Sequence, residues 1–314
     1  MHTSRIWVEE WSPEYGASTE LDDGWAATEE EVDPFVETAS WRPVAPEPSA
    51  LPRTAFIDGV DRVEARAALD HGPAPVPGLF GSVGAGAVVV DGTARFEACT
   101  VRRAAVFGSG IRPLLPAMSE PVSYLGIGAP GTRPEELRRE LQRVRTGLEE
   151  DLSRTLAGSG YLVLVDGPLR VREPLDLVGF IKRHHKSYLT PDLQAVATSL
   201  RKGERTPVFM FGAIRPRYSW YVRLADVENQ HPWAATSRCE VSTTLGLERA
   251  VALADLVTHH LPRFASKPFW DARAPQNLVP IATLERKLWS LLGDRQLIYR
   301  RIRSALRVRG AGDE

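Results

Sequence analysis

Two aspartates end apolar, strand-like segments of this chain, and a glycine follows each of them. Asp58 closes the segment Thr54-Ala-Phe-Ile-Asp58, and Asp166 closes Tyr161-Leu-Val-Leu-Val-Asp166. In an α/β sheet, carboxylates at the carboxyl ends of neighbouring parallel strands point into one crevice. Oxygen ligands without a nearby thiolate suit a hard divalent cation. Taken alone, an Asp-Gly pair is more typical of a simple turn, whereas two such pairs at the ends of apolar strands are as typical of a site as of turns.

A helix between the two segments supplies a candidate third carboxylate. The helix is predicted from Pro134 to about Ala157, with a proline in its first turn and Gly158 and Gly160 at its end. If it packs antiparallel to the strand 161–166, the strand length of about 16 Å brings residues 146–149 level with Asp166. Glu149 is the carboxylate at that level. Glu150, about 100° around the helix, is the second choice, and a solvated acidic face is the alternative for both.

The remaining segments predict an α/β fold with one mixed sheet flanked by helices. Asp91-Gly92 is a hairpin signal, because a tight turn favours positive φ at such residues. Strands are expected at 87–91, 94–101, 104–107, 208–211 and 220–224, helices at 191–200 and 247–260, and a basic amphipathic helix or helix pair at 284–306.

Charge is distributed unevenly along the 314 residues, although the net charge is only −1. Residues 1–50 hold 12 Asp and Glu against 2 Arg, together with six large aromatic residues. We therefore divide the chain into an acidic, aromatic arm over 1–50 and a domain over 51–314 with a basic C-terminal helical region. Because acidic residues repel phosphate, the arm is predicted to dock a protein or to fold back on the domain.

A basic stretch over residues 179–225 favours binding of a polyanion. It carries nine Lys and Arg against two acidic residues, with aromatic residues among them. Aromatics interleaved with cations suit single-stranded DNA, whose bases stack while its phosphates pair. At strand spacing, Tyr221 and Arg223 are expected to face the groove and Trp220 to face the core. Lys182 is expected to stabilise charge on a reacting phosphate.

The two cysteines, Cys99 and Cys239, lie far apart and form no CxxC motif. This pattern argues against a thiolate zinc site or a disulfide framework. The sequence also lacks an apolar run of membrane-spanning length and the start of a signal peptide. We therefore expect a soluble cytoplasmic protein without a membrane partner.

Six short motifs, in this order, resemble the NurA nuclease family, whose fold is RNase H-like. They are Phe56-Ile-Asp-Gly-Val-Asp-Arg62, Leu162-Val-Leu-Val-Asp-Gly-Pro-Leu169, Gly179-Phe-Ile-Lys182, Ser219-Trp-Tyr-Val-Arg-Leu224, Arg238-Cys-Glu-Val241 and Ala274-Pro-Gln-Asn-Leu-Val-Pro-Ile281. With the Trp7, Trp11 and Tyr15 start, the similarity covers nearly the whole chain.

The resemblance implies a two-metal deoxyribonuclease that uses Mn²⁺ or Mg²⁺. Asp58, Glu149 and Asp166 match its metal-holding carboxylates. It further implies a 5′–3′ exonuclease with single-strand endonuclease activity, acting on DNA ends and single strands during end resection and repair. The partners implied are a second copy of the chain, as a homodimer, and a HerA-type hexameric ATPase.

DNA contacts implied by the motifs fall on Arg62, Lys182, Tyr221, Arg223, Gln276 and Asn277. One departure concerns the last motif, since archaeal members carry a His that 278–283 lacks. Either Gln276 or Asn277 takes over part of that role, or the fourth metal contact is missing; the sequence leaves both readings open. An RNase H-like scaffold that binds DNA and an ATPase without cutting is therefore the alternative function.

A dinucleotide-binding enzyme is a second alternative, because Gly126-Ile-Gly-Ala-Pro-Gly131 matches GxGxxG. Pro130 and Pro134 delay the helix beyond the third glycine, and no acidic residue ends a strand about 20 positions later. Both observations disfavour this alternative.

Overall fold

The computed structural model describes residues 6–8, 31–115, 122–182, 188–226, 231–267 and 274–308. The strands are β1 (Ile6–Val8), β2 (Val32–Asp33), β3 (Thr54–Leu69), β4 (Val76–Asp91), β5 (Thr93–Phe107), β6 (Leu125–Gly128), β7 (Leu162–Asp166), β8 (Leu177–Ile181), β9 (Phe209–Phe211), β10 (Arg217–Arg223) and β11 (Thr236–Ser242). The α-helices are α1 (Pro134–Gly158), α2 (Pro191–Ser199), α3 (Leu247–His260), α4 (Val279–Leu292) and α5 (Arg295–Val308), and short 3₁₀ turns span Thr243–Leu245 and Leu261–Arg263.

The strands of the described residues form one mixed, mostly antiparallel sheet flanked by helices, so the predicted α/β class is confirmed. The sheet has eleven strands in the order β2-β9-β10-β11-β8-β7-β3-β4-β5-β6, and β1 pairs with β3 outside this path. Parallel pairing joins β3 to β7, β7 to β8, and β5 to β6. None of the helices in the described ranges is both long and apolar enough to cross a lipid bilayer.

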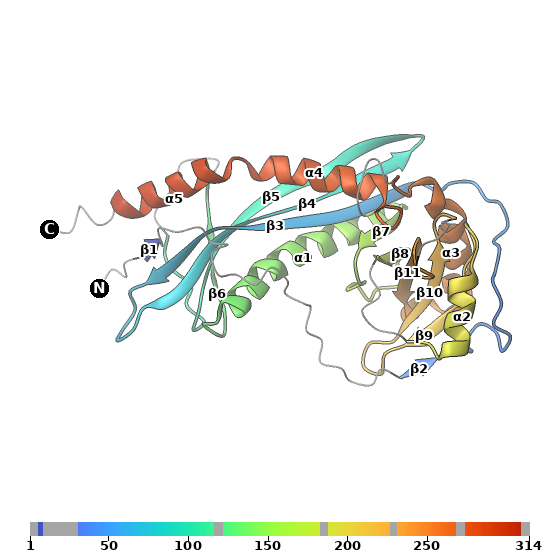
Figure 1. Ribbon diagram of the computed structural model, residues 1–314. Helices are drawn as coiled ribbons and strands as arrows, with labels where there is room; N and C mark the ends of the chain where they lie inside the picture. Colours follow the sequence, from blue (N-terminus) through green and yellow to red (C-terminus); the bar gives the residue numbers. More distant parts are fainter. Residues whose placement is uncertain are drawn as a thin grey trace.

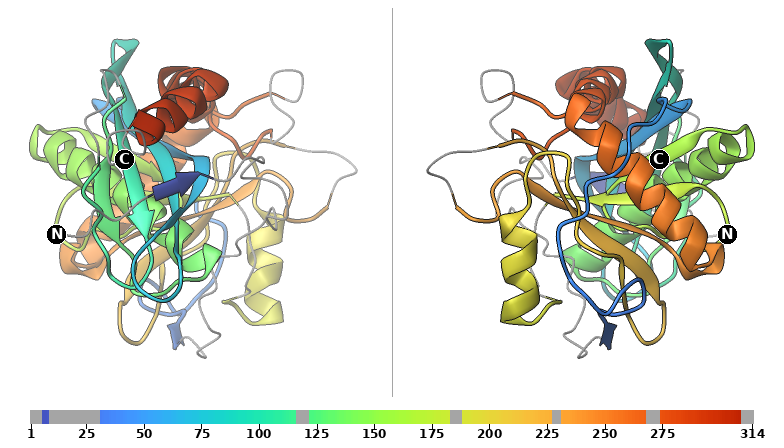
Figure 2. Two further views of the ribbon diagram at one scale, coloured as in Figure 1. Left: turned by 90° about the vertical axis from the view of Figure 1, so that its left-hand side faces the viewer. Right: turned by 90° about the vertical axis from the view of Figure 1, so that its right-hand side faces the viewer.

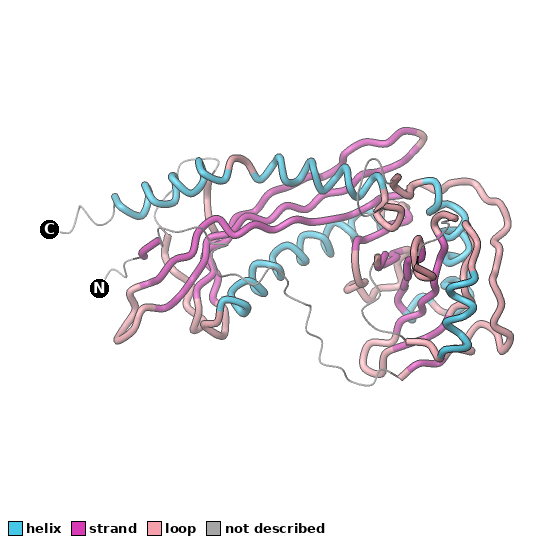
Figure 3. The backbone as a smooth tube through the Cα atoms, viewed as in Figure 1, coloured by secondary structure: helices cyan, strands magenta, loops and turns pink. Residues whose placement is uncertain are grey.

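Three long strands, β3, β4 and β5, form the extended part of the sheet (Figure 1). Figure 3 shows them running side by side far beyond the short strands of the other half. The predicted hairpin at Asp91-Gly92 is confirmed, with Asp91 paired to Thr93. The prediction of separate strands at 94–101 and 104–107 is wrong, because β5 is continuous.

Residues 76–86, which are rich in glycine and were not among the strands expected from the sequence, belong to β4. Several glycines of this strand lie where the side chain of a neighbouring residue occupies the space that a Cβ atom would need. A Cβ atom at Gly81 would lie 2.4 Å from the Leu141 side chain of α1. Close approach of the helix therefore explains why a strand here contains residues of low β propensity.

Helices cover both faces of the long strands (Figure 1). α1 packs against β3 and β4 through Leu137, Leu141 and Leu148, as its apolar stripe predicts. α4 packs against the opposite face through Leu284, Leu288 and Leu292, and α5 continues along that face with Ile298 and Ile302 in the core. The predicted basic C-terminal region is therefore a helix pair.

The other half of the sheet is also covered on both faces. Figure 2 shows α2 and α3 on opposite sides of the strands β9–β11. α3 packs on a core that contains Trp220 and Cys239, whereas α2 packs on the face that contains Phe209 and Tyr221. The predicted helices 191–200 and 247–260 correspond to α2 and α3.

The described parts of the first fifty residues pair with the sheet or pack against it. β1 pairs with the far end of β3, and β2 pairs with β9. Glu37 accepts two hydrogen bonds from the buried Arg205, at 2.8 and 3.0 Å, and Asp255 accepts a third at 2.7 Å. Trp11, Tyr15 and Trp25, on which the docking prediction for the arm also depends, lie outside the described residues.

Candidate functional site

Parallel pairing of β3 with β7 brings Asp58 and Asp166 together. Ile57 pairs with Val165, so that the two aspartates follow at the same level of the sheet. The two carboxyl groups are close enough for the negative charge of Asp166 to raise the pKa of Asp58. Both line one cavity of about 250 Å³. The predicted juxtaposition is confirmed.

The prediction that Asp58 ends its strand is wrong. β3 continues without a turn through Asp58-Gly59 to Leu69, and it pairs with β4 along this length. Only the parallel pairing with β7 stops at Ile57, because β7 itself ends at Asp166. The two carboxylates therefore mark the place where the sheet changes from parallel to purely antiparallel pairing.

Glu149 reaches the same cavity from α1. Its carboxylate lies against Gly59, where an added Cβ would be only 2.1 Å from Oε1. A glycine after Asp58 is therefore needed for the helix carboxylate to approach the strand. Glu150 also lines the cavity, but its side chain is 30% exposed and pairs with Arg154 at 3.4 Å. The Glu149 side chain is 12% exposed, which favours Glu149 as the inward carboxylate.

Burial and mutual repulsion act on these carboxyl groups. Burial raises the pKa of Asp58 well above its ordinary value, and the negative charges of Asp166 and Glu149 raise it further. Lys182 and the Gly59 amide, which donates to Asp58 Oδ1 at 2.7 Å, oppose this shift. Burial also raises the pKa of Glu149, against the lowering effect of Arg145 and then Arg170. The cavity therefore holds acidic groups that an added cation would stabilise in their charged form.

Lys182 stands at this site, where sequence analysis placed it. Its Nζ donates to Asp166 Oδ2 at 2.7 Å and to Asn277 Oδ1 at 2.8 Å. Asn277 is fully buried, so its predicted direct contact with DNA is wrong. It orients Lys182 instead. Its neighbour Gln276 is partly exposed and remains a candidate for a DNA contact.

Arg62 does not lie in a DNA groove, contrary to its predicted role. Its guanidinium donates to Glu64 at 2.9 and 3.0 Å and to the carbonyl oxygen of Gly293 at 3.0 Å. Glu64 is itself buried, and Leu292 and Gly293 form the C-terminal end of α4. Arg62 therefore neutralises a buried carboxylate and caps the C-terminus of α4. Cationic groups at this end of a helix are stabilising.

The predicted DNA groove over 179–225 is also corrected. Tyr221 is 1% exposed and stacks on Phe209, so it has no free face for a base, and burial raises its pKa to about 12. Arg223 donates to the carbonyl oxygens of Leu200, Pro232 and Ala234. These side chains hold α2 and the segment after 231 against β10. Arg183 and Lys186 lie outside the described residues.

Two charged residues that line the cavity, Arg145 and Arg170, escaped sequence analysis. Arg145 donates to the Gly59 carbonyl oxygen at 3.2 Å and lies 3.5 Å from Asp61 and 3.7 Å from Glu149. Its position four residues before Glu149 on a helix was a usable signal, because such residues share a face. Arg170, which lines the cavity after the Gly167-Pro168 pair, gave no such signal.

The oxygen donors of the cavity suit Mg²⁺ or Mn²⁺ in kind. Within the described ranges, no group of three or more His, Cys, Asp or Glu side chains is already arranged around one metal position. Asp58, Asp166 and Glu149 nevertheless line one cavity, where Lys182 and Arg145 act as counter-ions to them. Burial is the main reason why the pKa values of Asp58 and Glu149 are raised, so the charged form of both carboxyl groups is disfavoured in the metal-free cavity. The donor set therefore fits a hard cation that competes with these side-chain cations.

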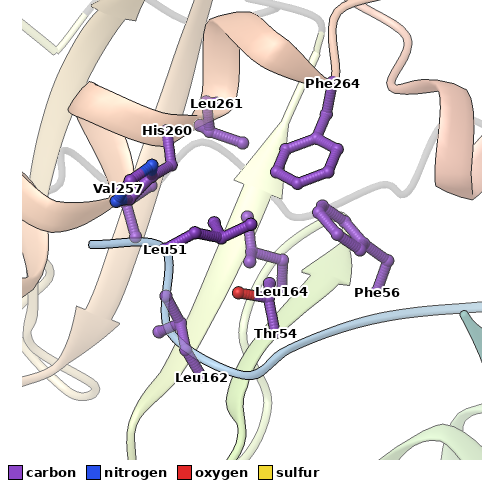
Figure 4. Close-up of a pocket in the computed structure, with 9 residues that line it drawn as sticks. All are labelled: Leu51, Thr54, Phe56, Leu162, Leu164, Val257, His260, Leu261 and Phe264. Carbon is purple, nitrogen blue, oxygen red and sulfur yellow. The ribbon is translucent and has the colours of Figure 1, made fainter. Parts of the chain in front are cut away.

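A second, apolar pocket between β3, β7 and α3 offers no comparable chemistry (Figure 4). Phe56 and Phe264 meet edge to face there, with ring centroids 4.8 Å apart. Its volume of about 10 Å³ is that of a single water at most. His260 on its rim is held by Ser49 and by the Ala50 carbonyl oxygen. We regard this pocket as a packing defect of the core.

No family model matches this chain, and neither does a curated protein.

Proposed function

We propose that this chain is a metal-dependent deoxyribonuclease of the NurA type, with an RNase H-like fold. The observation that carries the proposal is the cavity shared by Asp58, Asp166 and Glu149, with Lys182 bound to Asp166. The order of strands adds support. An antiparallel β5-β4-β3 unit continues through the parallel strands β7 and β8, and α1 lies between β5 and β7 in the chain. This is the arrangement of RNase H-like folds, and such an analogy concerns the fold alone.

The three carboxylates would hold the metal ions, Mn²⁺ or Mg²⁺. When bound, a metal pair supplies an activated water and neutralises charge on the attacking and leaving oxygens of a phosphodiester. Lys182 would stabilise the charge that develops on the scissile phosphate, because hydrogen bonds to Asp166 and Asn277 hold its ammonium group beside the Asp166 carboxylate. Asp58 and Glu149 must lose their protons to bind a cation, so that proton release accompanies metal binding.

The cellular setting follows from the motifs rather than from the cavity. We propose a cytoplasmic homodimer that works on DNA ends and single strands with a HerA-type hexameric ATPase, as a 5′–3′ exonuclease and single-strand endonuclease in end resection. The paired strands β1 and β2 indicate that the described parts of the arm stabilise the domain. A docking role therefore falls to the exposed side chains of the arm, such as Phe35, which is 53% exposed.

Cleavage of labelled single- and double-stranded DNA in Mn²⁺ tests the activity. We expect D58N and D166N to abolish cleavage with the fold intact, because each removes an anionic ligand. E149Q is expected to act in the same way, and E150Q, which changes the carboxylate paired with Arg154, serves as its matched control. Cleavage near the wild-type rate by D58N or D166N at saturating Mn²⁺ would refute the proposal.

A non-cutting scaffold is the second candidate function. The observation that favours it is the last motif, where Asn277 is buried and 278–283 contain no His to contact a metal. A wild-type chain that binds DNA but cleaves none of the substrates in Mn²⁺ or Mg²⁺ would support this candidate. Cleavage that depends on Asp58 excludes it.

A further inference from the structure

One wall of the carboxylate cavity is the loop that follows β7. Gly167, Pro168, Leu169 and Arg170 all line the cavity. Arg170 is exposed, and it is close enough to Glu149 to lower the pKa of that carboxyl. Across the described residues it makes no hydrogen bond or ion pair, whereas Arg145 and Lys182 are both engaged. Arg170 can therefore bind a new anion without losing an existing partner.

Charged side chains of β10 and β11 hold this loop by its main chain. The buried Glu240 accepts a hydrogen bond from the Leu169 amide at 2.8 Å, and Arg217 donates to the Leu169 carbonyl oxygen. Glu240 in turn pairs with Arg217 at 3.0 Å and Arg238 at 2.9 Å. Both main-chain groups of the residue before Arg170 are thus fixed by charge-assisted hydrogen bonds, which are among the stronger kind.

The loop also lies directly on β8. A Cβ atom at Gly179 would be 2.7 Å from the Leu169 nitrogen and 3.0 Å from the Gly167 oxygen. Only glycine leaves this space, because the clashing atoms belong to the backbone. Gly179 and Glu240 stand in two of the short motifs found in the sequence, and the cleavage chemistry proposed above uses neither residue.

We propose that Arg170 binds a phosphate of the DNA strand beside the carboxylate cavity, and that Glu240, Arg217 and Gly179 position it through the main chain of Leu169. This inference rests on the proposed function, because it names how that site recognises its substrate. A guanidinium group binds a phosphate through two parallel hydrogen bonds. These bonds orient the phosphate in addition to neutralising its charge. An arginine at the cavity mouth also attracts a polyanion to a site that is otherwise acidic.

Binding of a 5′-fluorescein-labelled single-stranded oligonucleotide, measured by anisotropy in EDTA, tests Arg170 without cleavage. We expect R170A to weaken binding about 10- to 100-fold, the value of one charge-assisted contact. The slope of log K against log salt should decrease by about 0.7. R170K should restore part of the affinity. R172A is the matched control, because Arg172 is an exposed arginine two residues along that does not line the cavity.

Methylphosphonate linkages locate the contact on the DNA. Neutralising phosphates one at a time should weaken wild-type binding most at one position, and that position should lose its effect in R170A. If R170A and R172A bind the oligonucleotide equally well, or if the methylphosphonate pattern of R170A equals that of the wild type, the inference is wrong. Neither result affects the proposed nuclease, which stands or falls with D58N and D166N cleavage.

The positioning role is tested with G179A. Its added methyl must displace the loop, so we expect the affinity to fall as in R170A and the double variant R170A/G179A to bind no more weakly than either. Circular dichroism and thermal melting verify that G179A is folded. If G179A does not fold, R217K replaces it in the same double-mutant cycle, because lysine lacks the guanidinium group that donates to the Leu169 carbonyl oxygen. Additive losses in the cycle would refute positioning through the loop.

Discussion

Replacing Asp58 with Asn should change how the stability of the metal-free protein depends on pH. Burial and the charges of Asp166 and Glu149 raise the pKa of Asp58 in the folded state above its value in the unfolded chain. The stabilising effect of the retained proton is therefore complete below the unfolded-state pKa, about 3.9. It is lost as the pH rises through the folded-state pKa. Above the folded-state pKa the ionised Asp58 thus destabilises the fold, and Asn removes this cost.

The size of the effect follows from proton linkage. Between the two pKa values, the unfolded chain has released a proton that the folded chain retains. One such group lowers the free energy of unfolding by about 1.4 kcal/mol for each pH unit. The pKa of Glu149 is also raised in the folded state. Between its unfolded-state and folded-state pKa values, Glu149 therefore adds a similar decrease of the free energy of unfolding with pH. D58N should remove the contribution of one group and leave that of Glu149 in place.

Urea unfolding at a series of pH values in EDTA measures the slopes. The free energies of unfolding of D58N and the wild type should differ least at the lowest pH values. As the pH rises, D58N should become more stable relative to the wild type. Saturating Mn²⁺ should reverse the order, since a ligand at 100 times its Kd stabilises the wild type by about 2.7 kcal/mol and D58N by less. Equal pH slopes for the two proteins in EDTA would refute the conclusion that the pKa of Asp58 is raised in the folded state.

Two further predictions concern other contacts of the structure. G59A should weaken Mn²⁺ binding and cleavage while the protein stays folded, because the added methyl group would occupy the place of the Glu149 carboxylate. Calorimetric titration with Mn²⁺ tests this prediction. G147A is the control, because no atom lies near its added methyl group. E37Q should lower the free energy of unfolding by about 1–3 kcal/mol, because the buried Arg205 loses the charge of one of its two partners; an unchanged urea midpoint would contradict it.

The elements around the site were predictable where local signals agree. α1 has a proline start, an apolar stripe and glycines at its end, and β7 is a continuous apolar run between turn residues. Matching the lengths of these two elements was sufficient to place Glu149. The long β4 was not predictable, because the reasons for its glycines are tertiary contacts, such as the Leu141 side chain of α1 at Gly81 and the Phe107 side chain of β5 at Gly78.

Prediction was weakest for residues whose role depends on their partner. Arg62, Tyr221 and Arg223 have the types that bind nucleic acid, yet tertiary contacts turn each of them inward. Only Arg62 carried a local warning, because Glu64 stands two residues along and shares its face of the strand. The basic residues of 179–225 are real, but the buried Arg205 pairs with Glu37 and Asp255, and Arg217 pairs with the buried Glu240.

β3 pairs with β4 on one side and with β7 on the other, and these two partners lie at different distances from β3 in the sequence. This difference affects the order in which the molecule folds. Its partner β4 follows directly in the chain, whereas β7 comes after β4, β5, β6 and α1. Local hairpins close with a small loss of chain entropy, and non-local parallel pairings close more slowly. The β3–β5 meander is thus expected to form first, with Asp58 already in place. Asp166 joins it only when the chain returns along β3, so the site is completed by one of the latest steps of folding.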